Sequence, residues 1–185
     1  MDFDSYKNMV GAFYMPKLVY INSATLLTLP EEQFISGMGE VLKHGLIRDS
    51  GYYEWIRDHH SAILQRDLDV CREMVRISDE IKRPVVENDP REQGERALLN
   101  FGHTLGHAIE KLKNFELLHG QCVALGCIAA AELSAMRGKL NADQVAEIRE
   151  RFESFGFPVT VDKLEAAEII RATKNDKKME AGKIK

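Results

Sequence analysis

The sequence is poor in several features that mark whole classes of protein. It has only three cysteines in 185 residues, an odd number whose spacing fits neither a disulfide framework nor a four-thiolate zinc site. Its longest apolar stretch, Cys122 to Ala131, has about half of the roughly 20 residues that a bilayer-spanning helix needs, and its N-terminus lacks a signal-peptide pattern. We therefore expect a soluble, cytoplasmic protein with reduced thiols and no membrane partner.

An excess of positive charge is also missing. The 25 Lys and Arg residues are outnumbered by 29 Asp and Glu residues, which gives a formal net charge of −4. No basic block is present of the kind that neutralises phosphates along a nucleic-acid footprint, so we expect no nucleic-acid partner. With 44% hydrophobic residues, the chain is long enough to bury one sizeable core.

Strand-like sequence is scarce as well. Only Leu18 to Ile21 has the β-branched and aromatic composition of a strand, between Pro16 and the turn-like Asn22. A single strand has no sheet partner, so residues 1–22 are expected to form an isolated strand-and-loop piece. The expected fold class is all-α: a multi-helix bundle over residues 23–185, preceded by this short strand segment.

Nearly everything after residue 22 has the apolar spacing of amphipathic helices. Pro30 suits a first helical turn, and Asn141 suits an N-cap. Residues 88–94 are dense in turn-forming and charged residues and predict a loop with a functional role. The expected helices cover residues 30–48, 52–65, 69–86, 95–112, 119–138, 141–155 and 161–173.

The predicted helix 95–112 carries an unusual polar stripe. Its members are spaced by four, three and four residues and fall within an arc of roughly 60°: Arg96, Asn100, His103 and His107. The other faces are apolar, which indicates a mostly buried helix. Each unpartnered polar group on it would cost on the order of 1–3 kcal/mol. The stripe therefore indicates a ligand, a metal or a wet cleft, and mutually satisfied core hydrogen bonds are the alternative.

A second group of chemically active residues lies on the predicted helix 30–48. Glu40 and Lys43 are three residues apart and share a face, which by itself is typical of an ordinary solvated ion pair. Glycines at 37, 39 and 45 weaken that interpretation, because each costs roughly 1 kcal/mol in a helix and permits close approach of a backbone or ligand. Glu40 is therefore a candidate metal ligand.

One carboxylate and two imidazoles, with a position left open, form the ligand set of a catalytic zinc site. His119 begins the helix after the stripe and can bring a third imidazole to it. Spacing alone does not choose among His103, His107 and His119 for the two imidazole positions.

Four blocks of the sequence carry a resemblance to a known family. They are GMGEVLKHG at 37–45, REQGERALLNFGHTLGHAIE at 91–110, LHGQCVALG at 118–126 and DKK at 176–178. Their order and spacing resemble those of 3-dehydroquinate synthases, the sugar-phosphate cyclases of the shikimate pathway. The long central block is highly specific, whereas DKK alone would be weak.

The resemblance implies a role for each matching residue. Glu40, His103 and His119 would hold Zn²⁺ or Co²⁺, His107 would transfer protons, and Glu92 would accept a proton. The remaining substrate contacts would come from Asn8, Lys43, Lys82, Arg96, Asn100 and Lys177. NAD would be touched by Lys7, Thr25, Leu26, Leu27 and Thr28.

The implied reaction is the cyclisation of 3-deoxy-D-arabino-heptulosonate 7-phosphate, a small phosphorylated sugar acid, with phosphate release and transient oxidation by NAD. The family also has an N-terminal α/β domain that binds most of the NAD, and this sequence contains no Gly-rich phosphate-binding turn. We therefore expect the C-terminal helical domain, inactive alone, with residues 1–22 as a remnant of the domain junction. The sequence does not decide whether the chain forms a homodimer.

Other functions compete with this interpretation. One is a related cyclase with another sugar phosphate, or a metal-dependent protein similar to alcohol dehydrogenases. Lys82, Arg96 and Asn100 favour an acidic phosphorylated substrate over a simple polyol. Another is a non-catalytic helical interaction module.

Overall fold

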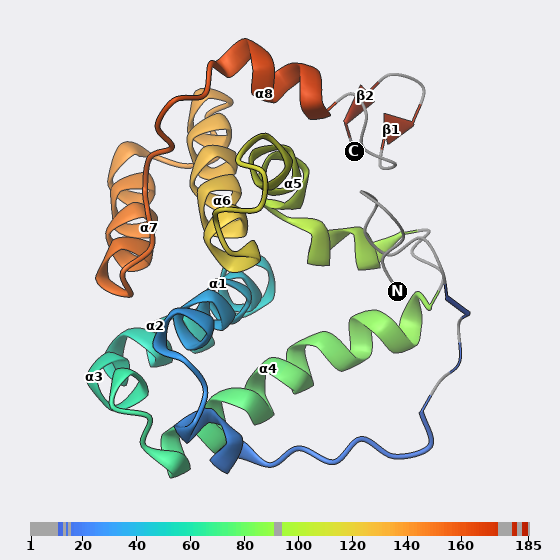
Figure 1. Ribbon diagram of the computed structural model, residues 1–185, viewed down its shortest axis with the longest axis vertical. Coiled ribbons are helices and arrows are strands. Elements are labelled where there is room, and N and C mark those ends of the chain that lie inside the picture. The colour runs from blue at the N-terminus through green and yellow to red at the C-terminus, as the bar shows by residue number, and fades with distance from the viewer. Residues whose placement is uncertain are drawn as a thin grey trace.

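The computed structural model describes residues 11–12, 14, 16–90, 94–173, 179–180 and 183–184, with side chains as far as residue 173. Helices dominate these residues, which confirms the all-α class (Figure 1). A two-residue antiparallel hairpin, β1 (Met179–Glu180) with β2 (Lys183–Ile184), is the sheet found in them. The helices are η1 (Ser23–Leu27), α1 (Glu31–Arg48), α2 (Ser50–Asp58), α3 (His60–Leu64), α4 (Leu68–Asn88), η2 (Glu95–Asn100), α5 (His103–Leu112), α6 (His119–Met136), α7 (Ala142–Ser154) and α8 (Ala166–Thr173).

Several helix boundaries differ from the predicted ones. The predicted helix 52–65 is two helices, α2 and α3, separated at His59, and the predicted helix 161–173 begins only at Ala166. The predicted N-cap at Asn141 is confirmed, because its side chain accepts a hydrogen bond from the Gln144 backbone N–H at 2.9 Å. None of the helices in the described part of the chain has the length and apolar character needed to cross a membrane.

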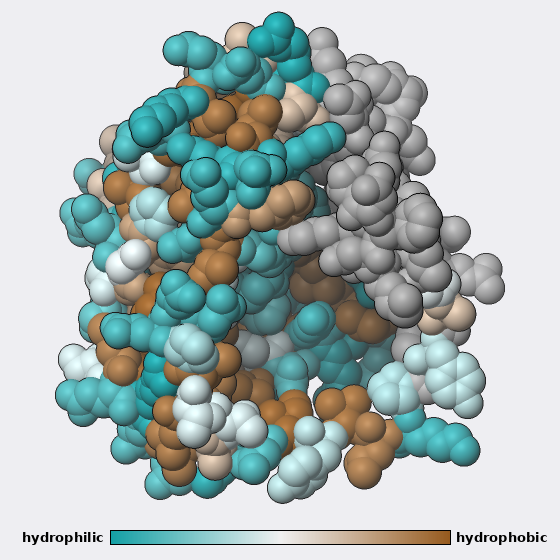
Figure 2. Space-filling model, viewed as in Figure 1, coloured by the Kyte–Doolittle hydropathy of each residue, from teal (hydrophilic) through white to brown (hydrophobic). Residues whose placement is uncertain are grey.

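The strand expected at residues 18–21 is not formed. The segment has no regular secondary structure, and Leu18 and Tyr20 are 82% and 83% exposed. It runs as an extended trace below α4 (Figure 1), and apolar side chains gather along the same lower edge of the surface (Figure 2). Strand composition alone does not form a strand without a partner for its backbone N–H and C=O groups.

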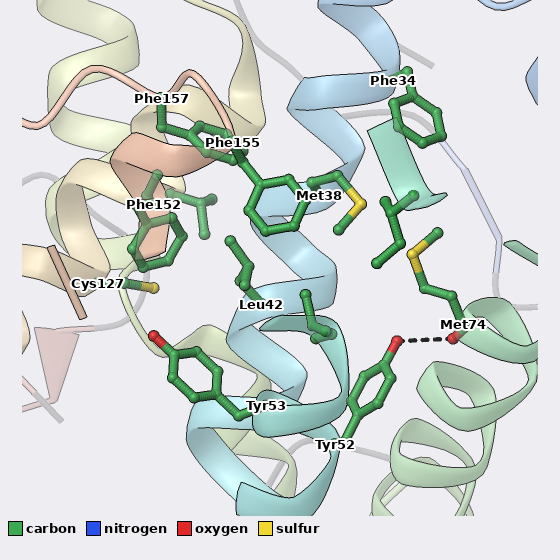
Figure 3. Packing of buried hydrophobic residues seen from close by; sticks show 14 of the residues in the cluster. Phe34, Met38, Leu42, Tyr52, Tyr53, Met74, Cys127, Phe152, Phe155 and Phe157 are labelled. Carbon is green, nitrogen blue, oxygen red and sulfur yellow. Dashed lines mark hydrogen bonds between the residues drawn. The ribbon is translucent and has the colours of Figure 1, made fainter. Parts of the chain in front are cut away.

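The main core surrounds one face of α1. Phe34, Met38 and Leu42, spaced by four residues, are 5%, 1% and 0% exposed. They pack among aromatic side chains from α2 and α7 (Figure 3). The buried Tyr52 hydroxyl donates to the backbone carbonyl of Met74 at 2.8 Å, so the polar tip of this core residue is satisfied.

Helix α6 approaches its neighbours closely because small residues line it. A Cβ at Gly120 would lie 1.8 Å from the backbone oxygen of Ser36, and one at Gly126 would lie 1.9 Å from that of Gly102. These glycines let the backbone of α6 touch α1 and the start of α5 directly. The first residue of α6, His119, is thereby placed beside the middle of α1.

Candidate metal centre

Three elements bring a carboxylate and imidazoles together. Glu40 comes from α1, His103 begins α5 and His119 begins α6. The Nε2 atoms of His103 and His119 lie 3.3 Å and 3.8 Å from the same Glu40 oxygen, Oε1. The structure thus brings together the three residues that the family resemblance implies as metal ligands.

The polar stripe forms in a different way from the one predicted. Residues 95–112 are not one helix, because the chain breaks at Gly102, whose φ is +77°. A Cβ there would lie 2.7 Å from Cys127 Sγ, so both the backbone conformation and the contact with α6 require glycine. The break makes His103 the first residue of α5 and leaves Arg96 and Asn100 on η2.

His107 joins the same cluster. The nitrogen atoms that His103, His107 and His119 can offer to a metal all lie within 4.8 Å of one another. The ring centroids of His103 and His107 are 5.3 Å apart, and those of His107 and His119 are 5.7 Å apart. The carboxylate contacts distinguish His103 and His119 as the imidazoles next to Glu40.

The donor set fits a tetrahedral cation. Ligands at about 2.1 Å from a tetrahedral zinc ion are about 3.4 Å apart, close to the 3.3 and 3.8 Å found here. His103 Nδ1 lies 3.1 Å from the Phe101 carbonyl oxygen, which can only accept, so Nδ1 carries the proton. In the neutral imidazole Nε2 is then an acceptor facing a carboxylate oxygen, and Glu40 Oε1 is buried without a hydrogen-bond partner. Two acceptors at this distance require a proton or a cation between them.

The charges of the site act on each other. Burial alone raises the pKa of Glu40, but His103, His119 and the ammonium of Lys43 together hold that pKa well below its ordinary range. The pKa of His119 is raised, mainly by its interaction with Glu40. The carboxylate is therefore ionised at neutral pH and available to a cation.

Lys43 is buried instead of forming the solvated ion pair that is usual at this spacing. It is 2% exposed, and its Nζ atom donates to Glu40 Oε2 at 2.6 Å and to the Leu99 carbonyl at 2.7 Å. A buried ammonium group is tolerated when it is paired and hydrogen-bonded. Lys43 thus links Glu40 on α1 to Leu99 on η2.

A cavity of about 220 Å³ lies next to the cluster. Four of the predicted substrate residues line it, together with two predicted metal ligands: Lys43, Lys82, Arg96, Asn100, Glu40 and His103. Two further lining residues, His44 and Leu99, were not predicted. Burial, followed by the charge of Lys43, lowers the pKa of His44 to about 4, so this imidazole is neutral. The cavity therefore combines positive charge with the carboxylate that is the candidate metal ligand.

Other predicted residues lie elsewhere. The segment Thr25 to Thr28 lies in and just after η1, and the guanidinium of Arg66 donates to the carbonyls of Leu26 at 2.9 Å and Leu29 at 2.6 Å. This segment does not line the cavity beside the cluster, and it is mostly exposed. The remaining predictions, Lys7, Asn8, Glu92 and Lys177, fall outside the described residues.

Sequence reasoning missed Glu110. It is 5% exposed, and its Oε2 lies 3.5 Å from His119 Nδ1. Its position seven residues after His103 places it on the same helical face as that histidine, and this spacing is the signal in the sequence that could have identified it.

Comparison with known proteins gives matches over almost the whole chain. The family model for the C-terminal part of 3-dehydroquinate synthase matches residues 37–179, and the model for the N-terminal part matches residues 1–36. The 3-dehydroquinate synthase of Acetivibrio thermocellus is 41% identical over 184 residues, which is 100% of this chain and 51% of that protein. That of Nitrosomonas europaea is 42% identical over 180 residues, covering 97% and 49%. The chain thus spans about half the length of these curated relatives.

Solved structures show the same fold. A 2-epi-5-epi-valiolone synthase from Streptomyces hygroscopicus, with NAD⁺ and Zn²⁺ bound, superposes with a TM-score of 0.85 at 21% identity, over 93% of this chain and 48% of that one. A 2-deoxy-scyllo-inosose synthase with carbaglucose-6-phosphate, NAD⁺ and Co²⁺ gives 0.84 at 24% identity, over 96% and 49%. Because the C-terminal family model matches most of its length, the chain belongs to the 3-dehydroquinate synthase family.

Proposed function

We propose that this chain is the metal- and substrate-binding half of a 3-dehydroquinate synthase, which converts 3-deoxy-D-arabino-heptulosonate 7-phosphate to 3-dehydroquinate and phosphate. The observation that carries the proposal is the Glu40, His103 and His119 cluster at the edge of a cavity lined by Lys82 and Arg96. A metal centre beside two cations suits a substrate with a phosphate, a carboxylate and an oxidisable hydroxyl.

Glu40, His103 and His119 would hold Zn²⁺, for which Co²⁺ can substitute. When bound, the metal supplies Lewis-acid polarisation of a substrate oxygen, and NAD⁺ supplies the hydride acceptor. His107 lies within the imidazole cluster and would move a proton there. Glu92 would accept a further proton.

The cationic residues would bind and orient the substrate. The Arg96 guanidinium suits a bidentate contact with a carboxylate or phosphate, and Lys82 acts as a point charge. Lys43 uses two hydrogen bonds on Glu40 and Leu99, and an ammonium group has three donors, so one remains for the cavity. The other proposed substrate contacts are Asn8, Asn100 and Lys177.

The proposal extends to the setting of the enzyme. Lys7 and the segment from Thr25 to Thr28 would touch NAD at one edge, and the chain alone would not turn over. All three cysteines are buried and none of them forms a disulfide in the described structure, which suits a reducing cytoplasm. A homodimer is a further expectation, which light scattering would test.

Substrate binding tests this proposal directly. Titration calorimetry with the heptulosonate phosphate and the zinc-loaded chain should show binding that weakens by about 10- to 100-fold in Arg96→Ala or Lys82→Ala, because each removes a hydrogen bond to a charged group. Arg72→Ala is the matched control, since Arg72 is an exposed cation on α4 paired with Asp69. Equal affinity in all variants would reject the cavity as the substrate site. Phosphate release by the chain alone with NAD would contradict its proposed inactivity.

A further inference from the structure

Each of the two imidazoles beside Glu40 has an oxygen atom at its other nitrogen. For His103 this is the backbone carbonyl of Phe101, 3.1 Å from Nδ1. For His119 it is the carboxylate of Glu110, 3.5 Å from Nδ1. In both rings Nε2 is the nitrogen that faces Glu40, at 3.3 and 3.8 Å.

Glu110 is placed for this contact by packing. It lies in the last part of α5, 5% exposed, while His119 begins α6 with 43% of its side chain exposed. The connection between the two helices turns through Asn114 and Phe115, both with positive φ, and brings the ends of α5 and α6 together. A carboxylate this deeply buried needs a hydrogen-bonded or charged neighbour, and the His119 ring is such a neighbour.

We propose that Glu110 is a positioning residue for the metal centre: its carboxylate accepts the Nδ1–H of His119, which leaves Nε2 unprotonated and aimed at the site that Glu40 and His103 share. An acceptor at the outer nitrogen of a metal-ligating histidine fixes the ring's tautomer and orientation and makes the ligating nitrogen more basic. The contact is more consequential for His119 than for His103, because His119 is the more exposed ring and is less held by packing.

This inference rests on the proposed metal site, so its test needs a readout that is independent of the metal. The ¹⁵N chemical shifts of His119 in the metal-free chain, at a pH high enough to leave the imidazole neutral, report which nitrogen carries the proton. The wild-type chain should have Nδ1–H, and Glu110→Ala should shift His119 toward the Nε2–H form. Glu110→Gln should keep Nδ1–H, because the amide oxygen still accepts.

Zinc affinity, measured by competition with a chelator, supplies the second readout. Glu110→Ala should weaken binding by about 10- to 100-fold, as loss of such partners does elsewhere, and Glu110→Gln should fall between it and the wild type. Glu116→Gln is the matched control, an exposed carboxylate three residues before His119, and should leave affinity and tautomer unchanged. Cobalt absorption spectra should change in Glu110→Ala alone.

The outcomes separate the two ideas. If the wild-type chain binds no zinc, the metal assignment fails, and the tautomer of His119 still decides the role of Glu110. If zinc binds but Glu110→Ala keeps both the wild-type tautomer and affinity, the positioning role is wrong. If Glu110→Ala does not fold, Glu110→Gln decides the question. An Nε2–H tautomer with wild-type zinc affinity in that variant would overturn the proposal, whereas an Nδ1–H tautomer supports it.

Discussion

The two sides of α1 differ in the kind of side chain that they bury, since one side is apolar and the other carries charge. On one side Phe34, Met38 and Leu42 fill the aromatic core, where the Tyr52 hydroxyl has a hydrogen-bond partner (Figure 3). On the other side the side chain of Glu40 is 35% exposed, but one of its oxygens is buried without a hydrogen-bond partner and faces imidazole nitrogens. The first region is held by apolar packing, although the buried Tyr53 hydroxyl there has no hydrogen-bond partner, whereas the second gathers charged groups around a candidate cation site. Stability and metal binding should therefore be separable by mutation.

Gly120→Ala should break both regions at once and have the largest effect. Its Cβ would lie 1.8 Å from the Ser36 backbone oxygen, so α1 and α6 must separate. We expect a loss of about 4 kcal/mol or more in the free energy of unfolding, measured with urea, together with loss of zinc binding. Gly37→Ala is the control, because nothing lies within 4 Å of its Cβ, and it should be neutral or stabilising. Comparable losses in both variants would disprove the close-contact argument.

Leu42→Ala should damage only the core. Leu42 is 0% exposed, and its truncation is expected to cost about 2–5 kcal/mol through lost burial and a residual cavity. The zinc affinity of the folded fraction should stay within about threefold of the wild type, because Leu42 lies about 200° around α1 from Glu40 and packs in the core on the other side. Leu64→Ala, at an exposed position, should cost much less. A large loss of zinc affinity in Leu42→Ala would show that the two sides are coupled.

His44 gives the polar side a dependence on pH. Its pKa is about 4 in the folded chain against 6.5 for an exposed histidine, so below pH 6.5 the unfolded chain binds more protons and stability falls as the pH falls. Between pH 7 and pH 5 this group should remove about 2 kcal/mol from the zinc-free chain. In His44→Phe the free energy of unfolding, measured with urea, should lose that share of its pH dependence. The same change between pH 7 and pH 5 as in the wild type would refute the lowered pKa of His44.

The exposed N-terminal segment should matter least. Leu18 makes no core contact at 82% exposure, so Leu18→Ser should change the free energy of unfolding by less than about 0.5 kcal/mol. Thermal and urea unfolding would measure this. A cost above 1.5 kcal/mol would mean that the segment is packed in solution.

The sequence predicted the helical class and most helices because apolar spacing reports which face is buried. It placed Arg96, Asn100, His103 and His107 on one helix, whereas a left-handed Gly102, required by the contact with Cys127, divides them. Local periodicity cannot show a break that a distant helix imposes. Three of these residues, Arg96, Asn100 and His103, still lie close together as predicted, because all three line the same cavity.

Burial of charge was harder to predict. The spacing of Glu40 and Lys43 is typical of a surface pair, and only the Leu99 carbonyl and the cover from neighbouring elements make Lys43 a buried residue. Glu110 was missed because its partner, His119, lies on another helix. Pairings across elements depend on packing, which sequence spacing does not encode.

Zinc content tests the central claim most directly. After purification in zinc-replete buffer and removal of excess metal, elemental analysis of the wild-type chain and of Leu42→Ala should give about one zinc per chain. Glu40→Gln should give almost none, because the amide is a poor zinc ligand, while it can still accept a hydrogen bond from Lys43. A wild-type chain without zinc, or a Glu40→Gln chain with the wild-type content, would contradict the account.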